Sequence, residues 1–396
     1  MIRMRVLIVG AGIAGPTLAY WLRRTGHDVT LVERAPRLRE GGYVVDFWGA
    51  GFEVAERIGI VPRLRDEGYR FREAREVGGD GRRIAHFDPQ RVIDGAAGRY
   101  VTIGRSDLSR AIYDALDGDV ETIFGDTVAA LADDGGRVGV TFQSGAEREF
   151  DLVVGADGLH SRVRALAFGP EREFERHLDI AVAAFDIDGY RPRDELVAVM
   201  HTEVGAQALR IALRDGATMF CIMFRHEGEL PVDDVTAQQD LLRERLTGFG
   251  WEMPQILAQL PQARTFYMDG ASQMLMPSWS RGRIALVGDA AACPSLLAGQ
   301  GSALAMVEAY VLACALAEAS GDHRAAFADY ENRLAGLVRR KQDGAVGLSG
   351  AFVPRNRMML LLRNAVFGLM GVPFIENLAI GRSLRDPIEL PPVPAG

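Results

Sequence analysis

The stretch that decides the fold is residues 5–33, which read RVLIVGAGIAGPTLAYWLRRTGHDVTLVE. Its first apolar run, Arg5–Val9, is typical of a buried strand. The pattern over residues 13–25 predicts a helix that ends at Gly26. A second apolar run, residues 28–32, predicts another strand. Strand, helix and strand in this order indicate a βαβ unit within a parallel sheet.

Three glycines occupy the turn between this strand and this helix in the spacing G-x-G-x-x-G. Gly10 permits a tight turn, Gly12 lets the backbone approach a pyrophosphate, and Gly15 lets the helix pack closely on the strand. The helix N-terminus presents free N–H groups and a positive dipole to phosphates. Glu33 ends the second strand, where an acid accepts hydrogen bonds from ribose hydroxyls and disfavours the 2′-phosphate of NADP. The similar run at residues 49–51 lacks a third glycine, so we expect one dinucleotide site.

The composition excludes several other function classes. The chain has 396 residues, of which 53 are acidic and 45 basic, and it shows none of the basic stripes that nucleic-acid-binding proteins carry. Lys341 is the only lysine. Schiff-base chemistry, a lysine nucleophile and a P-loop each need a lysine at a defined place. Lys341 instead lies in the charged run RRKQDG, which is typical of a solvated helix face. The histidines show no metal-ligand spacing, so we expect no metal site.

Cysteine use and the chain ends indicate a reduced, cytoplasmic protein. Cys221, Cys293 and Cys314 are far apart and odd in number, so no disulfide framework follows. The first residues, MIRMRVLIVGAG, lead directly into a strand and lack the layout of a signal peptide. The apolar tract at residues 364–375 is shorter than the about 20 residues of a membrane-spanning helix. We expect no integral membrane segment, and we expect residues 358–378 to form a helix packed on the dinucleotide-binding domain.

The middle of the chain changes to an antiparallel pattern. Asp215-Gly216 is a strong hairpin signal between two apolar runs. The parallel-strand pattern returns at residues 283–287, and a long apolar helix is predicted over residues 302–319. The dinucleotide-binding domain is therefore expected to be interrupted in sequence. The predicted antiparallel strands are residues 180–187, 196–201, 208–213 and 217–224.

Two further strand–turn motifs flank this antiparallel segment. A buried strand ends in the turn Asp157-Gly158, and Ser161 is placed to cap the helix that follows. A later strand ends in Gly288-Asp289, and the run Gly299-Gln300-Gly301 opens the long apolar helix. Glycines at a helix start offer N–H groups and a positive dipole, which suits the N1–C2=O edge of a reduced, anionic flavin. Asp289 is placed to hold the hydroxyls of a ribityl chain.

With these three motifs in this order, the chain resembles the single-component, para-hydroxybenzoate-hydroxylase-like (class A) FAD-dependent monooxygenases. The resemblance covers the whole chain and is closest to the tetracycline-inactivating branch, whose loop near the flavin is similar to GGYVVD at residues 41–46. It implies an α/β fold in which a Rossmann-like FAD-binding domain of the GR2 type is interrupted by an antiparallel-sheet substrate domain. The implied boundaries are 1–70, 99–175 and 275–350 for the FAD-binding domain, 71–98 and 176–274 for the substrate domain, and 351–396 for a C-terminal helical segment.

The resemblance also assigns cofactor contacts along the chain. Arg105 has a separate argument, because a cation beside a helix N-terminus is unfavourable unless an anion such as a phosphate lies close. The chain departs from the family at Ala292, where a histidine is common, and at Ser302 and Ala303, where an asparagine is common. Proton handling near the flavin is therefore not assigned. The implied FAD contacts are Gly10, Gly12, Ala14, Gly15, Glu33, Arg34, Asp46, Arg105, Asp157, Gly158, Gly288, Asp289, Gly299 and Gly301.

The implied reaction is an oxygen transfer. NADPH or NADH reduces a tightly and non-covalently bound FAD, O2 forms a flavin C4a-hydroperoxide, and one oxygen atom passes to an aromatic or polyketide-like small molecule. No catalytic acid, base or nucleophile is identified. We expect NAD(P)H to bind transiently and the chain to act as a monomer or weak homodimer.

Three alternatives stay open. Baeyer–Villiger-type oxygenation could occur on the same fold, a geranylgeranyl-reductase-like enzyme would share the first motif, and an FAD-holding regulatory protein would lack NAD(P)H oxidase activity. A flavin-dependent halogenase would need an active-site lysine, and a two-Rossmann oxygenase would need a second glycine fingerprint. The sequence shows neither.

The antiparallel segment is expected to form one wall of the substrate cavity. It is rich in apolar side chains, among them Met223 and Phe224, which strand alternation sends to opposite faces. Met223 is the candidate apolar contact. His201, Arg210 and His226 are the candidate polar contacts. Such a wall suits a large aromatic or polyketide-like molecule better than a small benzoate.

Overall fold

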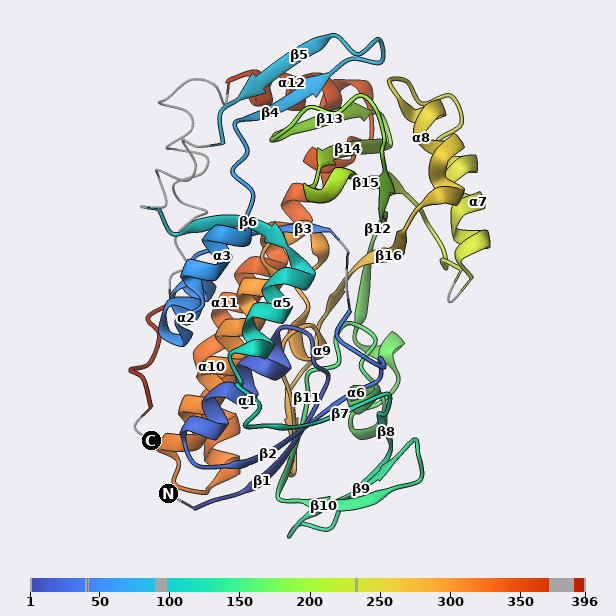
Figure 1. The fold of residues 1–396 in the computed structure, drawn as a ribbon. Coiled ribbons are helices and arrows are strands. Elements are labelled where there is room, and N and C mark those ends of the chain that lie inside the picture. The colour runs from blue at the N-terminus through green and yellow to red at the C-terminus, as the bar shows by residue number, and fades with distance from the viewer. Residues whose placement is uncertain are drawn as a thin grey trace.

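The computed structural model describes residues 2–39, 41, 43–89, 98–231, 234–369 and 388–394. A six-stranded sheet lies in the lower half of Figure 1 and a seven-stranded sheet in the upper half, and long helices run beside and between them. Chain segments cross between the halves several times, so each half is assembled from separate stretches of sequence. The predicted fold class, an α/β sheet domain interrupted by an antiparallel sheet, is confirmed.

The six-stranded sheet is built around the predicted βαβ unit. Strand β1 (Arg5–Val9) lies in the middle and pairs in parallel with β2 (Asp28–Glu33) and β11 (Leu152–Gly155). All three strands are almost completely buried, as expected for parallel strands covered on both faces. Helix α1 (Ala14–Arg24) connects β1 to β2. The remaining strands are β7 (Glu121–Phe124), β17 (Ser280–Arg281) and β18 (Ile284–Leu286).

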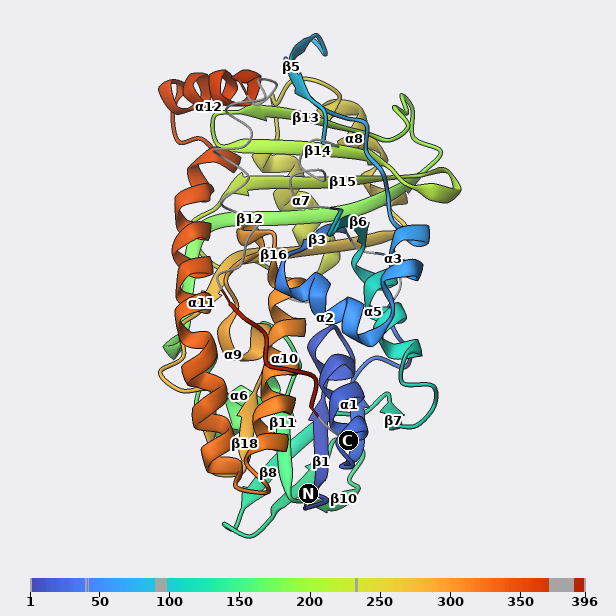
Figure 2. The same cartoon turned by 90° about the vertical axis from the view of Figure 1, so that its left-hand side faces the viewer.

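Two long helices follow the six-stranded sheet in the chain. Helix α10 (Gly301–Glu318) is long and apolar enough to cross a membrane, but 78% of that stretch is buried in the protein. Its Tyr310 ring packs edge-on against Trp21 of α1, with ring centroids 4.9 Å apart. Helix α11 (His323–Phe352) runs along the side of the molecule from the lower half to the upper half (Figure 2). Helix α10 is therefore a core helix.

The seven-stranded sheet has the order β16-β12-β15-β14-β13-β4-β5. All of its neighbouring strands are antiparallel except β13 and β4, which are parallel. The hairpin predicted at Asp215-Gly216 joins β14 to β15. Its strands are β4 (Glu73–Val77), β5 (Arg83–Phe87), β12 (Glu175–Asp188), β13 (Val197–Glu203), β14 (Ala206–Ala212), β15 (Ala217–Arg225) and β16 (Thr265–Met274).

Both faces of this sheet are covered by apolar groups. On the outer face, β15 packs Phe220, Ile222 and Phe224 against α7 (Val235–Arg245) and α8 (Met253–Gln259). On the opposite, inner face, Met223 packs with Leu297, and Met219 packs with Tyr43. Strand alternation therefore places the methionines of β15 inside and its phenylalanines outside.

The remaining elements surround the two sheets. Residues 358–378 were expected to pack on the dinucleotide-binding domain, and that prediction is wrong for the part that the structure describes. Helix α12 (Arg357–Leu369) packs on the seven-stranded sheet: Phe367 contacts Phe87 and Arg363 pairs with Glu76 at 3.0 Å. The other elements are β3 (Val44–Trp48), α2 (Ala50–Ile58), α3 (Val61–Glu67), β6 (Tyr100–Gly104), α5 (Arg105–Asp114), β8 (Val128–Asp133), β9 (Val138–Phe142), β10 (Glu147–Phe150), α6 (Arg162–Ala167) and α9 (Asp289–Ala292).

Candidate active site

The glycine loop leaves open space at one position only. A Cβ atom on Gly10, whose φ is +109°, would lie 2.5 Å from the Ala156 carbonyl oxygen, and a Cβ on Gly15 would lie 1.9 Å from the Gly10 oxygen. A Cβ on Gly12 would have no protein atom within 4 Å. The protein's own packing therefore requires the first and third glycines. The second faces free space at the start of α1, where a pyrophosphate would fit.

Glu33 lies beside the same loop. Its Oε2 accepts a hydrogen bond from the Ala11 N–H at 2.9 Å, and its Oε1 accepts one from the Ala35 N–H at 2.8 Å. The carboxylate is thus fixed at the end of β2, within one residue of Gly12. The neighbouring Arg34 is exposed. This arrangement suits a ribose placed next to the pyrophosphate.

The turn at Asp157-Gly158 adjoins the glycine loop through the Gly10 contact with Ala156. The Asp157 carboxylate accepts hydrogen bonds from the Ser161 hydroxyl at 2.5 Å and from the Arg162 N–H at 2.7 Å. Burial raises its pKa, and these hydrogen bonds oppose that rise. Ser161 caps α6, as predicted, by accepting from the Arg164 N–H at 3.0 Å. Asp157 therefore holds the shape of the turn.

The third motif brings Asp289, Arg105 and Tyr43 together. Asp289 begins α9, and its Oδ1 lies 3.7 Å from where a Cβ on Gly301 would be, at the start of α10. Burial raises the pKa of Asp289, and the nearby Arg105 guanidinium opposes that rise. Arg105 begins α5, and its N–H donates to the Tyr43 carbonyl at 3.1 Å. Burial raises the pKa of the Tyr43 phenol to about 12, so it is neutral. Acid, cation and phenol thus converge at the inner face of the seven-stranded sheet.

A buried arginine ties two of the motifs to each other. The Arg164 side chain is fully buried, and its Nη1 donates to the Ala290 carbonyl at 3.0 Å. Its Nη2 donates to the Leu159 carbonyl and to Glu171 Oε2, both at 2.5 Å. The Asp157-Gly158 turn and the α9 turn are therefore held by one guanidinium. Nothing in the local sequence pattern indicates this role, because Ala290 lies 126 positions from Arg164.

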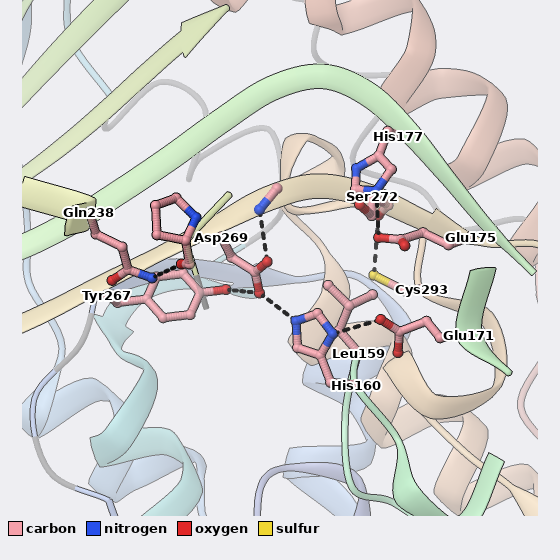
Figure 3. A network of polar contacts seen from close by, with 12 residues as sticks. Leu159, His160, Glu171, Glu175, His177, Gln238, Tyr267, Asp269, Ser272 and Cys293 are labelled. Carbon is pink, nitrogen blue, oxygen red and sulfur yellow. Dashed lines mark hydrogen bonds and ion pairs between the residues drawn. The ribbon is translucent and has the colours of Figure 1, made fainter. Parts of the chain in front are cut away.

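A polar network connects the Asp157-Gly158 turn to the seven-stranded sheet (Figure 3). His160 Nε2 lies 3.1 Å from Asp269 of β16, and its Nδ1 lies 2.8 Å from Glu171. The Tyr267 hydroxyl donates to the same Asp269 oxygen at 3.1 Å. The hydrogen bond to Asp269, followed by that to Glu171, raises the pKa of His160 to about 10, so the ring is an imidazolium. The sequence carried no signal for this contact, because its members are far apart in the chain.

The inner face of β15 turns toward these motifs. Met223 packs in one cluster with Leu297, which lies in the loop between α9 and α10, and with Val182 of β12. Burial raises the pKa of the Cys221 thiol, on the same face, to about 12. Tyr267 of β16 lies on the same face, in register with Cys221 through Ala184, and its ring centroid is 6.2 Å from that of Tyr43. Met223 therefore lies on the side of the sheet where the motifs meet.

The three predicted polar substrate contacts lie on the other face. His201 bonds the Val77 carbonyl and Glu203, and its ring packs on Phe249. Arg210 pairs with Asp194 at 2.6 Å and lines a cavity of about 360 Å³ beside α8. His226 contacts Phe224. The structure does not bring His201, Arg210 and His226 to the motifs: His201 and Arg210 have outward-facing strand positions, and His226 follows the end of β15. Their contact with the substrate stays a prediction.

Asp46 and Lys341 lie outside the clusters described above. Asp46 is exposed on β3 and accepts hydrogen bonds from the Tyr100 and Thr102 hydroxyls, both at 2.6 Å. Lys341 was expected on a solvated helix face, and this is wrong: it is half-buried and donates a hydrogen bond to Gln300 at the start of α10. Among the described residues, no group of three or more histidine, cysteine, aspartate or glutamate side chains could hold a metal ion.

Comparison with known proteins places this site in a family. Residues 3–333 match the family described as "FAD binding domain". An uncharacterized Mycobacterium tuberculosis protein is 39% identical over 340 residues, which are 85% of this chain and 91% of that protein. A flavin-dependent monooxygenase of Legionella longbeachae is 32% identical over 356 residues, 90% of this chain and 91% of that protein. The crystal structure of the tetracycline destructase Tet(51) is 31% identical, with a TM-score of 0.84 over 99% of this chain and all of that one.

The chain belongs to the FAD binding domain family, and within it to the class A FAD-dependent monooxygenases that its motifs resemble. It is an enzyme of the aromatic hydroxylase type. FAD fits the geometry above, since the open space at Gly12, the carboxylate of Glu33 and the cluster at Asp289 follow one another from β1 to α10.

Proposed function

We propose that this enzyme consumes NADPH or NADH and transfers one oxygen atom from O2 to an aromatic or polyketide-like small molecule. The observation that supports this most is the placement of the third motif. Asp289, Arg105 and Tyr43 meet directly beneath an apolar sheet face that carries Met219 and Met223. A cofactor held at the motifs would thus have an apolar wall above it.

The chain offers a partner for each part of FAD. The N-terminus of α1 at Gly12 would hold the pyrophosphate, and Glu33 would accept from the adenosine ribose. Arg105 supplies a cation near the phosphates and flavin, and Asp289 would hold the ribityl hydroxyls. The N-terminus of α10 would receive the pyrimidine edge of the flavin. Bound FAD supplies hydride acceptance and oxygen activation, which no side chain can provide.

The protein's part in the reaction is to position the substrate and exclude water. Met219, Cys221 and Met223 present an apolar surface, and the thiol stays neutral because burial raises its pKa. Tyr43 and Tyr267 supply neutral phenols at the edge of this surface. A largely apolar surface with two hydroxyls at its edge suits a polycyclic aromatic substrate. The likeness to a tetracycline destructase supports a substrate of that size.

The experiment that tests the proposal combines cofactor and product analysis. The purified enzyme should bind one FAD per chain, and its NAD(P)H consumption should rise with phenols or polyketides from a panel. A product heavier by one oxygen atom, with the label from isotopic O2, is expected. Position analysis of that oxygen separates ring hydroxylation from Baeyer–Villiger-type insertion. NAD(P)H consumption without labelled product for any compound would count against this substrate class.

We also propose a cytoplasmic enzyme that works as a monomer or weak homodimer. Among the described residues, the one helix that is both long and apolar enough to cross a membrane is mostly buried in the core, and the three cysteines are free thiols. Light scattering of the FAD-loaded protein at micromolar concentration tests the oligomeric state directly.

A further inference from the structure

Helix α12 presents an apolar face to solvent. Met358 is 75% exposed, Leu361 70% and Leu362 66%, and these are the three most exposed large apolar side chains of the described residues. Val366 and Leu369 are exposed as well. The five residues recur at i, i+3, i+4, i+8 and i+11, so they share one side of the helix, which we call the apolar face of α12. A surface helix normally carries polar residues on this side, and a large exposed apolar patch marks an interaction site.

The opposite side of α12 is already used for packing on the seven-stranded sheet. The Phe367 ring lies 5.2 Å from that of Phe87, and Arg363 pairs with Glu76 at 3.0 Å. Glu76 is fully buried, so this pair fixes the rotation of the helix about its axis. The helix lies at the upper end of the molecule in Figure 2, away from the six-stranded sheet. The apolar face of α12 is therefore held outward.

Exposed positive charge adjoins this face. Residues 344–369 contain three arginines and no acidic residue, whereas the whole chain has a net charge of −8. Arg355 and Arg357 are exposed, and they directly precede the apolar face along the chain. An apolar face flanked by arginines is typical of a helix that lies in a membrane interface.

The charged groups near these two arginines nearly balance one another. Arg225, at the end of β15, is close to the first of them, and Asp179 and Glu227 oppose its charge. The β4–β5 hairpin on which α12 packs, residues 73–88, contains four acidic residues and three arginines. The exposed charge beside the apolar face of α12 is therefore dominated by the two arginines.

Other occupants fit this face less well. A second copy docked with twofold symmetry would bring the arginines of both chains to the same rim, where like charges repel. The residues that follow in the chain, 370–387, include two acidic and two basic residues, so their sequence offers no excess of negative charge. A membrane surface offers both an apolar interior and, where anionic lipid is present, the negative charge that the arginines need.

We propose that the apolar face of α12 docks on the surface of a membrane that contains anionic lipid. The helix has 13 residues, fewer than the about 20 that span a bilayer, so it would lie along the surface. Its apolar side chains would enter the acyl boundary, with Arg355 and Arg357 at the level of the lipid phosphates. The net negative charge of the chain disfavours contact of other faces with anionic lipid. The inference does not depend on the proposed function, because binding is measured without turnover.

Sedimentation of the FAD-loaded, full-length enzyme with lipid vesicles tests this proposal. Phosphatidylcholine vesicles that contain phosphatidylglycerol should bind the enzyme, and pure phosphatidylcholine vesicles should bind much less. The bound fraction should fall as the salt concentration rises. Leu361→Glu should weaken binding at least about tenfold, because it removes an apolar contact and adds a charge that anionic lipid repels. Arg357→Gln should weaken it about fivefold.

Val235→Glu is the matched control for the added charge. Val235 is an exposed apolar residue at the start of α7, on a different part of the molecule. This variant should bind vesicles as the wild type does. The FAD content and the melting temperature of all three variants without vesicles should match the wild type, because the substituted side chains are exposed.

Each of the following results would overturn the proposal. A wild-type enzyme that binds neither kind of vesicle has no membrane-docking face, and equal binding to both kinds would exclude a role for anionic lipid. An equal loss of binding in Val235→Glu would mean that only overall charge matters. A dimer that Leu361→Glu dissociates would assign the face to a second copy. A large fall in the melting temperature of Leu361→Glu without vesicles would show that the chain itself covers the face. None of these results bears on FAD binding or product formation, so the proposed function is tested separately.

Discussion

At the scale of single residues, the three glycines of the first loop have different roles: two are needed for packing, and one faces open space. Gly10 and Gly15 contact backbone atoms closely, whereas Gly12 contacts nothing within 4 Å. The motif's spacing made the loop recognisable from the sequence. The structure adds the distinction between its members, which leads to a paired prediction.

We predict that Gly12→Val keeps the fold of the FAD-free protein and weakens FAD binding by roughly two orders of magnitude, because the new side chain displaces charge-assisted hydrogen bonds worth about 1.5–3 kcal/mol each. Gly15→Val is the comparison, since its Cβ would meet the Gly10 oxygen and should destabilise the FAD-free protein itself. FAD titration and thermal unfolding of the apoprotein measure both. Full FAD occupancy in Gly12→Val would show that the pyrophosphate lies elsewhere.

Arg164 gives the second residue-scale prediction. Removing a fully buried guanidinium leaves Glu171 Oε2 and two carbonyls without this donor, so Arg164→Met should lower the free energy of unfolding by about 3 kcal/mol. Urea unfolding of the apoprotein measures this. The exposed Arg162 is the control, and Arg162→Met should change the value by less than about 0.5 kcal/mol. Equal effects would remove the argument that Arg164 braces the two turns.

At the scale of elements, β15 shows why the substrate residues were harder to predict than the cofactor residues. Its inner residues, including Met223, and its outer residues, including Phe224, are all apolar. Strand geometry sends neighbouring residues to opposite faces, but because both sets are apolar, nothing in the sequence shows which set faces inward. His201 and Arg210 look like active-site groups by type, yet their parity places them under Phe249 and beside α8. The face to which each residue points can be assigned only when the helices and loops that cover the sheet are known.

The prediction for β15 concerns coupling between NAD(P)H oxidation and product formation. Met223→Lys should place a charge on the inner face of β15. Burying an unpaired polar group costs about 2–7 kcal/mol, so the variant should let water into this face. FAD binding and NAD(P)H oxidation should persist while product falls and peroxide rises.

Phe224→Leu is the control for this strand, because Phe224 packs outward on α7 and α8. It should lower the melting temperature and leave coupling as in wild type. Peroxide and product are measured per NAD(P)H consumed. Wild-type coupling in a folded Met223→Lys enzyme would place the substrate away from β15.

At the scale of the whole molecule, several contacts join segments that are far apart in the chain, and no local sequence pattern predicts them. The βαβ unit, the interrupted order of segments and the antiparallel sheet follow from short-range periodicity, and the structure agrees. The pairs His160–Asp269 and Lys341–Gln300 join residues 109 and 41 positions apart. Arg363 of helix α12 pairs with Glu76 of β4. Such pairs depend on how the helices and strands pack in the tertiary structure.

The His160 contact makes a pH-dependent link between the two halves. Folding raises its pKa from 6.5 to about 10, chiefly through Asp269. Its contribution to stability is therefore complete below pH 6.5 and is lost as the pH rises toward 10. His160→Gln should flatten the fall in melting temperature between these pH values. Melting curves of both proteins across that range check this, and parallel pH profiles would contradict it.

The central claim is that a single chain both accepts electrons from a nicotinamide nucleotide and uses them on oxygen. Rapid anaerobic mixing of the FAD-loaded enzyme with NADPH or NADH, with and without substrate, tests it most directly. The account predicts that the yellow flavin absorbance bleaches in at least one of these mixtures and that admitting O2 restores it with formation of oxygenated product. A flavin that neither nucleotide bleaches, even with substrate present, would contradict the claim and indicate a separate partner reductase.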